Sequence, residues 1–270
     1  MHQNTDIKIL FSDFDGTLFS KSKSISETDI QILQQMGLLG IVRVIATGRS
    51  FFSIRKVIPE TFPIDYIILS SGAGIMKWQT KQLLQISSIS GELTDALCSL
   101  LIKSDMPFFV QNPLPENHVG YYYLNRNQNP DFKRRLNLYR NFMEPIEKRR
   151  PGQTASQFIL IHRNEQEIKN LLKPFTSHLH LIKATSPLDH KTLWLEIFPS
   201  RISKASAAQW LMQHLNIRNE KSLAIGNDFN DLDLLHWASK AYVMPDSPKL
   251  LLDRFPVLTL NNGSVLSALF

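Results

Sequence analysis

The stretch "KILFSDFDGTLFS" at residues 8–20 decides the fold prediction, because its apolar run ends abruptly in two aspartates, a glycine and a threonine. A run that is apolar at every position is typical of a strand buried on both faces of a parallel sheet. Packing gives no reason to place Asp13 and Asp15 at its end, since adjacent carboxylates repel and desolvation adds to the cost. The pair therefore lies either in a solvated turn or beside a bound positive charge.

Further short apolar runs alternate with helical patterns towards both ends of the chain. Four of them predict strands: "IVRVIA" (41–46), "YIILS" (66–70), "SLAIG" (222–226) and "AYVM" (241–244). "SISETDIQILQQMG" and "SKASAAQWLMQHL" predict helices capped by Ser26 and Ser203, with Asp29 at the capping-box spacing after Ser26. This alternation predicts an α/β fold, a Rossmann-like parallel-sheet core with helices on both faces.

The middle of the chain has a different pattern of residues. It combines strand-like segments such as "PFFVQ" and "HLHLIKA" with a polar, proline-containing stretch and a basic helical segment, "DFKRRLNLYRNFMEPI". We therefore predict a discontinuous core domain formed by residues 1–82 and 191–270, with an α+β domain inserted at residues 83–190.

Composition indicates an ordinary globular protein. Of its 270 residues, 43% are hydrophobic and 20% are charged. The formal net charge of +6 would suit nucleic acid, an acidic membrane surface or an anionic small substrate. The single cysteine, Cys98, excludes an intrachain disulfide and is expected to be buried. Since neither a secretory leader nor an apolar run of roughly 20 residues is evident, we expect a cytoplasmic protein without membrane contact.

Polar residues cluster where the predicted strands end. Because ligands bind outside the carboxyl ends of strands in open parallel sheets, we expect these side chains to share one edge. Their carboxylate and amide oxygens are hard ligands that suit Mg²⁺, which would make the two aspartates tolerable. Singly, each motif has a plainer explanation: Asp-Gly-Thr is typical of a turn, and Lys204 of a solvated surface. The strand-end residues are Asp13, Asp15, Thr47, Gly48, Arg49, Ser70, Ser71, Gly72, Asn227, Asp228, Asn230 and Asp231.

Taken together, "DFDGTL" (13–18), "ATGR" (46–49), Lys204 and "GNDFND" (226–231) resemble the four motifs of the haloacid dehalogenase superfamily. The insertion between the second and third motifs resembles the C2B cap of the Cof-type phosphatases. The resemblance implies a Mg²⁺-dependent phosphatase that acts on a small phosphorylated metabolite, with substrate specificity set by the cap.

The resemblance also implies a role for each motif. Asp13 would be the nucleophile that forms an aspartyl-phosphate, and Asp15 would exchange protons with the leaving group and water. Thr47 would hydrogen-bond the phosphoryl oxygens, and Lys204 would neutralise their charge. The implied phosphate or substrate contacts are Phe14, Gly16, Gly48, Arg49, Ser71 and Gly72. The implied metal-binding residues are Asp13, Asp15 (through its backbone carbonyl), Asn227, Asp228, Asn230 and Asp231.

The fourth motif departs from the family pattern Gly-Asp-x-x-Asn-Asp. Here the second position is Asn227, and an aspartate follows at Asp228. Either the Asn227 amide oxygen binds the metal, or the loop turns so that Asp228 does. With one negative charge fewer, the site is expected to bind Mg²⁺ more weakly.

Two alternatives remain open. A sucrose-phosphate-phosphatase-like or phosphomannomutase-like enzyme would belong to the same superfamily; a mutase differs from a hydrolase because a second sugar hydroxyl, and not water, attacks the aspartyl-phosphate. A nucleic-acid-binding protein is suggested by a basic cluster with the neighbouring tyrosines 121–123, although a solvated helix face is the simpler interpretation and no nucleic-acid partner is expected. The basic cluster comprises Lys133, Arg134, Arg135, Arg140, Lys148, Arg149 and Arg150.

Overall fold

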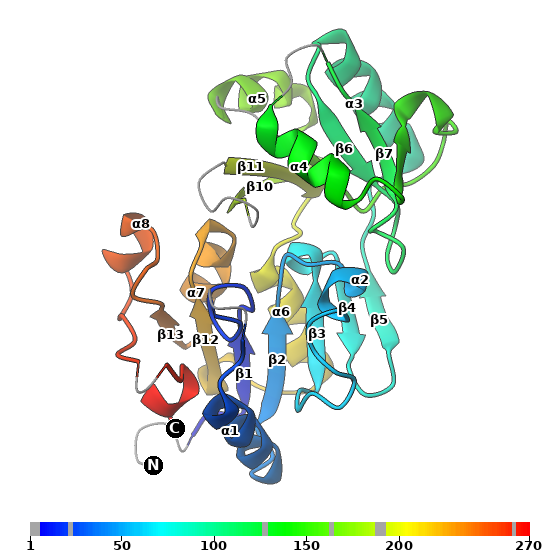
Figure 1. Ribbon diagram of the computed structural model, residues 1–270. Coiled ribbons are helices and arrows are strands. Elements are labelled where there is room, and N and C mark those ends of the chain that lie inside the picture. The colour runs from blue at the N-terminus through cyan, green and yellow to red at the C-terminus, as the bar shows by residue number, and fades with distance from the viewer. Residues whose placement is uncertain (1–5, 21–23, 126–128, 162–164, 187–192, 261–262) are drawn as a thin grey trace. The chain divides into compact units, whose positions relative to one another are not determined.

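The computed structural model describes residues 6–20, 24–125, 129–161, 165–186, 193–260 and 263–270 (Figure 1). The chain divides into two compact units. Unit 1 comprises Met1–Arg49, Arg55–Gln85 and Ser203–Phe270, and unit 2 comprises Ser50–Ile54 and Ile86–Ile202. The segment up to residue 202, which the sequence placed in the core from residue 191, thus belongs to unit 2. The reason is strand β11 (Leu193–Pro199), which pairs with β10 (Leu179–Thr185). The predicted boundary at 190/191 itself lies outside the described residues.

Unit 1 is built on a seven-stranded sheet in the order β13-β12-β1-β2-β3-β4-β5. The strands from β13 to β3 are parallel, and β4 returns antiparallel beside β3. The α/β core predicted from the sequence is therefore confirmed, with an antiparallel extension at one edge. The strands are β1 (Ile9–Ser12), β2 (Val42–Ala46), β3 (Tyr66–Leu69), β4 (Gly74–Lys77), β5 (Gln82–Ile86), β12 (Ser222–Gly226) and β13 (Lys240–Val243).

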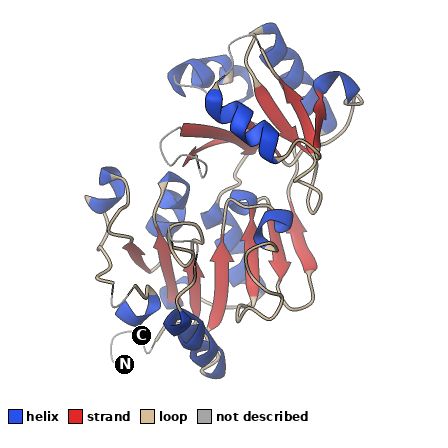
Figure 2. Cartoon of the chain, in the orientation of Figure 1, coloured by secondary structure: helices blue, strands red, loops and turns tan. Residues whose placement is uncertain are grey.

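Helices cover both faces of this sheet (Figure 2). On one face, α6 and α7 bury Ile9 and Phe11 of β1 together with Leu211 and Leu235. The helices of unit 1 are α1 (Glu27–Leu38), α6 (Lys204–His214), α7 (Leu232–Trp237) and α8 (Lys249–Leu252). Its short 3-10 helices are η1 (Ser70–Gly72), η4 (Asn219–Lys221), η5 (Phe229–Asp231) and η6 (Leu266–Ala268).

The two predicted helix caps have different outcomes. Ser203 caps α6 as expected, because its hydroxyl accepts the Ser206 N–H and the Ser206 hydroxyl accepts the Ser203 N–H. Ser26 precedes α1 but makes no side-chain cap, so that prediction is wrong. Asp29 is buried and accepts hydrogen bonds from the Ser264 hydroxyl and from two backbone N–H groups, those of residues 265 and 266. Its carboxylate therefore holds the C-terminal segment against α1.

Unit 2 contains a six-stranded sheet in the order β10-β11-β9-β6-β7-β8, antiparallel except for the β7–β8 pair. Leu97 of α3 and Ile168 of α5 pack with one set of strand residues, and Phe132 of α4 packs with another. The remaining strands are β6 (Phe108–Gln111), β7 (Gly120–Tyr123), β8 (Met143–Pro145) and β9 (Gln157–Ile161). The helices are α2 (Phe51–Ile54), α3 (Gly91–Lys103), α4 (Pro130–Leu138), α5 (Glu165–Leu171), η2 (Ile146–Lys148) and η3 (Lys173–Phe175).

Helix α2 follows the second motif in the chain but packs within unit 2. The Phe52 ring stacks on the His118 ring with their centroids 4.1 Å apart. The Phe142 ring meets the Phe52 ring edge-on at 4.8 Å. These aromatic contacts explain why a five-residue segment, Ser50–Ile54, leaves unit 1.

The basic cluster of unit 2 is more engaged than a solvated face would be. Arg135 is buried, and its guanidinium lies about 5 Å from the rings of Phe109, Tyr139 and Trp194. Arg149 is also largely buried and pairs with Asp95. The prediction of a solvated basic face is therefore wrong for these two arginines, which serve the interior of unit 2.

Candidate functional site

The ends of β1, β2, β3 and β12 lie at one edge of the unit 1 sheet because these strands run parallel in register. Ser12 at the end of β1 pairs with Ile45 of β2 and with Ile225 of β12. Beyond the strands, the Asp13 N–H donates to the Ile225 carbonyl. The Thr47 N–H likewise continues the ladder to β3. The first, second and fourth motifs thus begin side by side.

Lys204 joins the first and fourth motifs. Its ammonium nitrogen lies 2.6 Å from Asp13 Oδ1 and 2.6 Å from Asp231 Oδ1. Lys204 and Asp231 are fully buried, and Asp13 is 5% exposed. Lys204 is the first residue of α6, where the helix dipole is unfavourable for a cation. The two carboxylates offset that cost, so this lysine is held for its charge rather than solvated at the surface.

Burial and neighbouring charge act in opposite directions on this trio. Burial raises the pKa of the Asp13 carboxyl, the Asp231 carboxylate adds to the rise, and Lys204 opposes it. Burial alone would lower the pKa of Lys204, but the charges of Asp13 and Asp231 outweigh it and raise that pKa. Lys204 is therefore a permanent cation, and further positive charge beside Asp13 would favour its ionised, nucleophilic form.

Asp15 and Arg49 form a bidentate ion pair. Arg49 Nε donates to Asp15 Oδ2 at 2.7 Å and Arg49 Nη2 to Oδ1 at 2.5 Å. The Asp15 side chain is 38% exposed, in contrast to the buried Asp13. Arg49, which the sequence places among phosphate contacts, thus has its guanidinium on the second aspartate.

The second motif is held by the loop that follows β3. The Thr47 hydroxyl accepts the Arg49 N–H at 3.0 Å, so its own proton can be donated to a phosphoryl oxygen. Ser70 and Ser71 donate their backbone N–H groups to the carbonyls of Arg49 and Thr47. Both serines are buried with positive φ values, 47° and 54°, a conformation that non-glycine residues adopt rarely. Such local strain is common where a loop must hold functional groups in place.

Two glycines of the motifs have different surroundings. Gly72 has φ +115°, and a Cβ built on it would meet the Ser203 carbonyl oxygen at 2.3 Å. Its role is therefore to let the start of α6, which carries Lys204, approach the third strand. A Cβ on Gly48 would lie 3.6 Å from both the Ser71 hydroxyl and the Asn230 side chain, an ordinary contact distance. Ser71 and Asn230 therefore lie beside the second motif, and no steric reason requires a glycine at position 48.

The fourth motif wraps around the Asp231 carboxylate. Asp231 Oδ2 accepts the N–H groups of Asn227 and Asp228 at 2.8 and 3.0 Å, while Oδ1 accepts from Lys204. The Asp228 side chain caps η5 by accepting the Asp231 N–H. The Asn227 amide instead lies over the turn of the first motif, where a Cβ on Gly16 would meet its nitrogen at 2.3 Å. Asn227 therefore faces the turn of the first motif.

The donors at this edge suit a magnesium ion with several water ligands. Within the described ranges, no three His, Cys, Asp or Glu side chains are grouped to hold a metal ion. Mg²⁺ does not need such a group, because it commonly takes one or two carboxylates and keeps its waters. The Asp13 carboxylate, the Asp15 carbonyl and the Asn227 amide oxygen are hard donors of that kind. Asp15, Asp228 and Asp231 have their carboxylates engaged by Arg49, by η5 and by Lys204.

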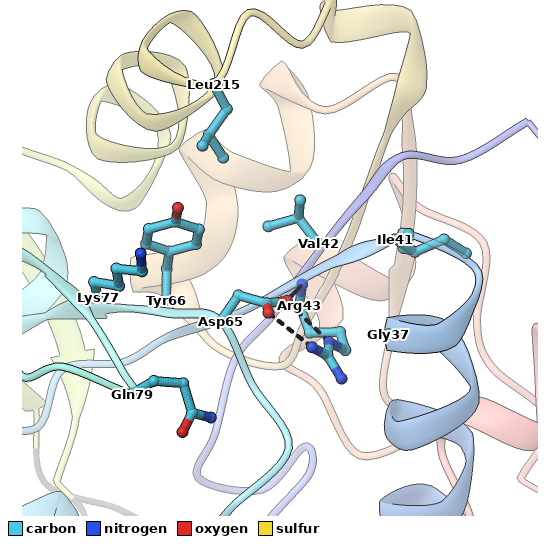
Figure 3. A pocket seen from close by; sticks show the side chains of 10 residues that line it. Gly37, Ile41, Val42, Arg43, Asp65, Tyr66, Lys77, Gln79 and Leu215 are labelled. Carbon is cyan, nitrogen blue, oxygen red and sulfur yellow. Dashed lines mark hydrogen bonds and ion pairs between the residues drawn. The ribbon is translucent and has the colours of Figure 1, made fainter.

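A separate pocket lies at the amino ends of β2 and β3, away from the motifs (Figure 3). It encloses about 250 Å³, and Figure 3 shows Arg43 and Asp65 paired within it. Arg43 Nε and Nη2 donate to the two Asp65 oxygens at 2.9 and 2.7 Å. Nη1 donates to the Leu33 carbonyl. This pair ties α1 to two strands and repeats the Arg49–Asp15 geometry outside the candidate site.

Sequence reasoning missed three residues at the site. Thr17 is buried, and its hydroxyl approaches Asp13 Oδ2 at 3.4 Å. Phe19 stacks on Phe14 with the centroids 5.1 Å apart. Ser203 supplies the backbone against which Gly72 packs. Thr17 and Phe19 stand inside the quoted first stretch, so their position was a usable signal; the Ser203 contact depends on the fold alone.

Comparisons with known proteins agree with this architecture. The family model of the haloacid dehalogenase-like hydrolases matches residues 10–268. The HMP-PP phosphatase of Cronobacter sakazakii is 24% identical over 257 residues, covering 91% of this chain and 87% of that protein.

Solved structures show the same fold. A haloalkanoate (HAD) superfamily phosphatase from Bacteroides thetaiotaomicron matches with a TM-score of 0.75 at 21% identity, covering 96% of this chain and 91% of the other. A haloacid dehalogenase-like hydrolase from B. subtilis matches with a TM-score of 0.73 at 19% identity, covering 95% and 96%. The resemblance drawn from the four motifs is confirmed: the chain belongs to the haloacid dehalogenase-like hydrolases.

Proposed function

We propose that this enzyme is a Mg²⁺-dependent phosphatase that hydrolyses a small phosphorylated metabolite through an aspartyl-phosphate on Asp13. The observation that carries the proposal is the Lys204 ammonium held between Asp13 and Asp231 at 2.6 Å from each, in a buried setting. A buried cation beside a strand-end carboxylate suits the transfer of a dianionic phosphoryl group, whose charge must be neutralised as the bond to oxygen forms.

The residues would divide the reaction as follows. Asp13 attacks phosphorus, and Asp15 protonates the leaving oxygen and later takes a proton from water. The Thr47 hydroxyl donates to a phosphoryl oxygen, and Lys204 stabilises the charge of both Asp13 and the phosphoryl group. Asp13, the Asp15 carbonyl and the Asn227 amide would hold Mg²⁺, which supplies charge stabilisation for the transferring phosphoryl group. Asp231 would serve by fixing Lys204 and the fourth loop.

Unit 2, by our proposal, is a C2B-type cap that selects the substrate. The match of the family model across the inserted unit supports this assignment. The Cronobacter sakazakii relative is named an HMP-PP phosphatase, which is said of that protein alone. For this chain we propose a sugar phosphate or similar phosphomonoester as the substrate. No helix in the described ranges is long and apolar enough to cross a membrane. A cytoplasmic location is part of the proposal.

The test is hydrolysis of an aryl phosphate with and without Mg²⁺ by the wild type and by Asp13→Asn. We expect metal-dependent turnover that the variant loses, since an amide is a poor nucleophile, while its circular dichroism spectrum stays native. Turnover by Asp13→Asn at the wild-type rate would overturn the assignment of the nucleophile. Product analysis with a sugar bisphosphate would separate hydrolysis from phosphoryl transfer to a second sugar hydroxyl.

A further inference from the structure

We propose that Arg49 is a positioning residue for Asp15 rather than a phosphate ligand, an inference that rests on the proposed phosphatase function. Two guanidinium nitrogens of Arg49 donate to the two oxygens of Asp15, at 2.7 and 2.5 Å. This fork fixes both the position and the plane of the carboxyl group, which a single contact cannot do. The Asp15 side chain is 38% exposed, so packing restricts it less than it restricts the buried Asp13.

The Arg49 guanidinium is itself held in place by two rings. Phe14 and Phe19 stack nearly parallel, 4° apart in plane. The central carbon of the guanidinium lies 5.3 Å from the Phe14 centroid and 5.5 Å from the Phe19 centroid, within the range of cation–π attraction. Phe14 and Phe19 lie on either side of Asp15 in the chain. One short loop therefore carries both the Asp15 carboxyl group and the two rings that contact the Arg49 guanidinium.

The backbone of Arg49 is fixed as well. Its N–H donates to the Thr47 hydroxyl, and its carbonyl accepts the N–H of Ser70. Arg49 is thus anchored through its backbone at the second motif and through its guanidinium at the first motif.

The proton transfers of the proposed reaction explain why the Asp15 carboxyl group would need to be held in place. In the first step, the Asp13 oxygen–phosphorus bond forms, the bond from phosphorus to the leaving oxygen breaks, and the Asp15 proton passes to that oxygen. In the second step, water attacks phosphorus, its proton passes to Asp15, and the Asp13–phosphorus bond breaks to release phosphate. Both transfers need the Asp15 carboxyl within hydrogen-bond reach of the accepting or donating oxygen. A fork that restricts this group serves both steps.

The experiment measures kcat/KM with Mg²⁺ for dinitrophenyl, nitrophenyl and phenyl phosphate, whose leaving oxygens depend increasingly on protonation. This ratio reports the first phosphoryl transfer, so slow hydrolysis of the aspartyl-phosphate does not mask the effect. We expect Arg49→Ala to lose about 10- to 100-fold on phenyl phosphate, a part of what positioned proton transfer contributes, and less than about threefold on dinitrophenyl phosphate. Arg49→Lys, which keeps the charge without the fork, should show the same selective loss.

Matched variants separate positioning from stability. Arg43→Ala removes an equivalent fork on Asp65 outside the site, and it should leave the ratio between the esters unchanged. Asp15→Asn should reproduce the selective loss, and adding Arg49→Ala to it should cost little more, as expected for two residues that act as a unit.

The outcomes are distinguishable. An equal loss on all three esters with Arg49→Ala and with Arg49→Lys, in folded protein, would overturn the inference and leave the phosphatase function standing. The same would follow if Arg43→Ala produced the selective loss. Failure of the wild type on these esters and on a panel of sugar phosphates and similar phosphomonoesters would remove the proposed function itself, and with it this inference.

Discussion

The ammonium nitrogen of Lys204 lies 2.6 Å from Asp13 Oδ1, although the two residues are 191 positions apart in the chain. The contact joins the first residue of α6 to the residue that follows β1. Since Asp231 accepts from the same nitrogen, one cation neutralises two buried carboxylates. The site and the packing of unit 1 therefore depend on the same charge.

Lys204→Ala should weaken both the site and the fold. Removing one partner of a buried ion pair leaves uncompensated charge, at a cost of about 3–5 kcal/mol in the free energy of unfolding. Turnover of an aryl phosphate should fall by roughly 10²–10³-fold, the usual effect of removing one charge-stabilising donor. Urea unfolding and steady-state kinetics check the two effects. Lys221→Ala, which removes a surface pair with Asp6, should change neither.

Asn227→Asp should strengthen Mg²⁺ binding, because a carboxylate at the turn of the first motif adds a charged hard donor. Without metal the same change should lower the unfolding temperature, since a further carboxylate then faces the Asp13 loop. The measurement is the unfolding temperature as a function of Mg²⁺ concentration. Asp228→Asn is the matched control: its amide oxygen can still cap η5, since asparagine caps a helix about as well as aspartate, and the variant should keep the wild-type response to Mg²⁺. The reverse pattern would assign the metal to Asp228.

Gly72→Ala should destabilise the protein more than Gly40→Ala. Both glycines have positive φ values, +115° and +71°, so both variants carry backbone strain of about 1–2 kcal/mol. Only at Gly72 does the new Cβ also meet a backbone atom, whereas nothing lies within 4 Å of a Cβ on Gly40. The difference between the two free energies of unfolding isolates the steric cost. Equal values would mean that α6 can move away from β3 without loss.

Cys98 should resist alkylation in the folded protein at pH 8. Burial raises the pKa of its thiol to about 11, so the reactive thiolate is scarce at that pH. Reaction with iodoacetamide should accelerate as the pH rises towards that value, and in denaturant it should proceed at the rate of an ordinary cysteine. Mass spectrometry of the folded protein gives the rate. Rapid labelling at pH 8 under native conditions would show that α3 opens readily.

The parallel core could be predicted from the sequence because each of its strands is a short apolar run that can be recognised locally. Apolar runs such as Ile9–Ser12 and Ser222–Gly226 require burial on both faces whatever their neighbours are. The sequence did not show which sheet β11 would join, since an apolar strand suits the interior of either sheet. The roles of Arg49 and Gly72 were also out of reach. They are set by Asp15 and Ser203, contacts that no local pattern encodes.

The passage of Ser50–Ile54 into unit 2 bears on how this chain can be recombined with its relatives. A chimera that exchanged only residues 86–202 would replace His118 and Phe142 while retaining the Phe52 ring that packs on them. Helix α2 of the recipient would then pack against residues of the donor. These new contacts would begin directly after Arg49, whose N–H is bound by the Thr47 hydroxyl of the second motif. A unit 2 transplanted between such enzymes must therefore be moved as two segments, one of them only five residues long.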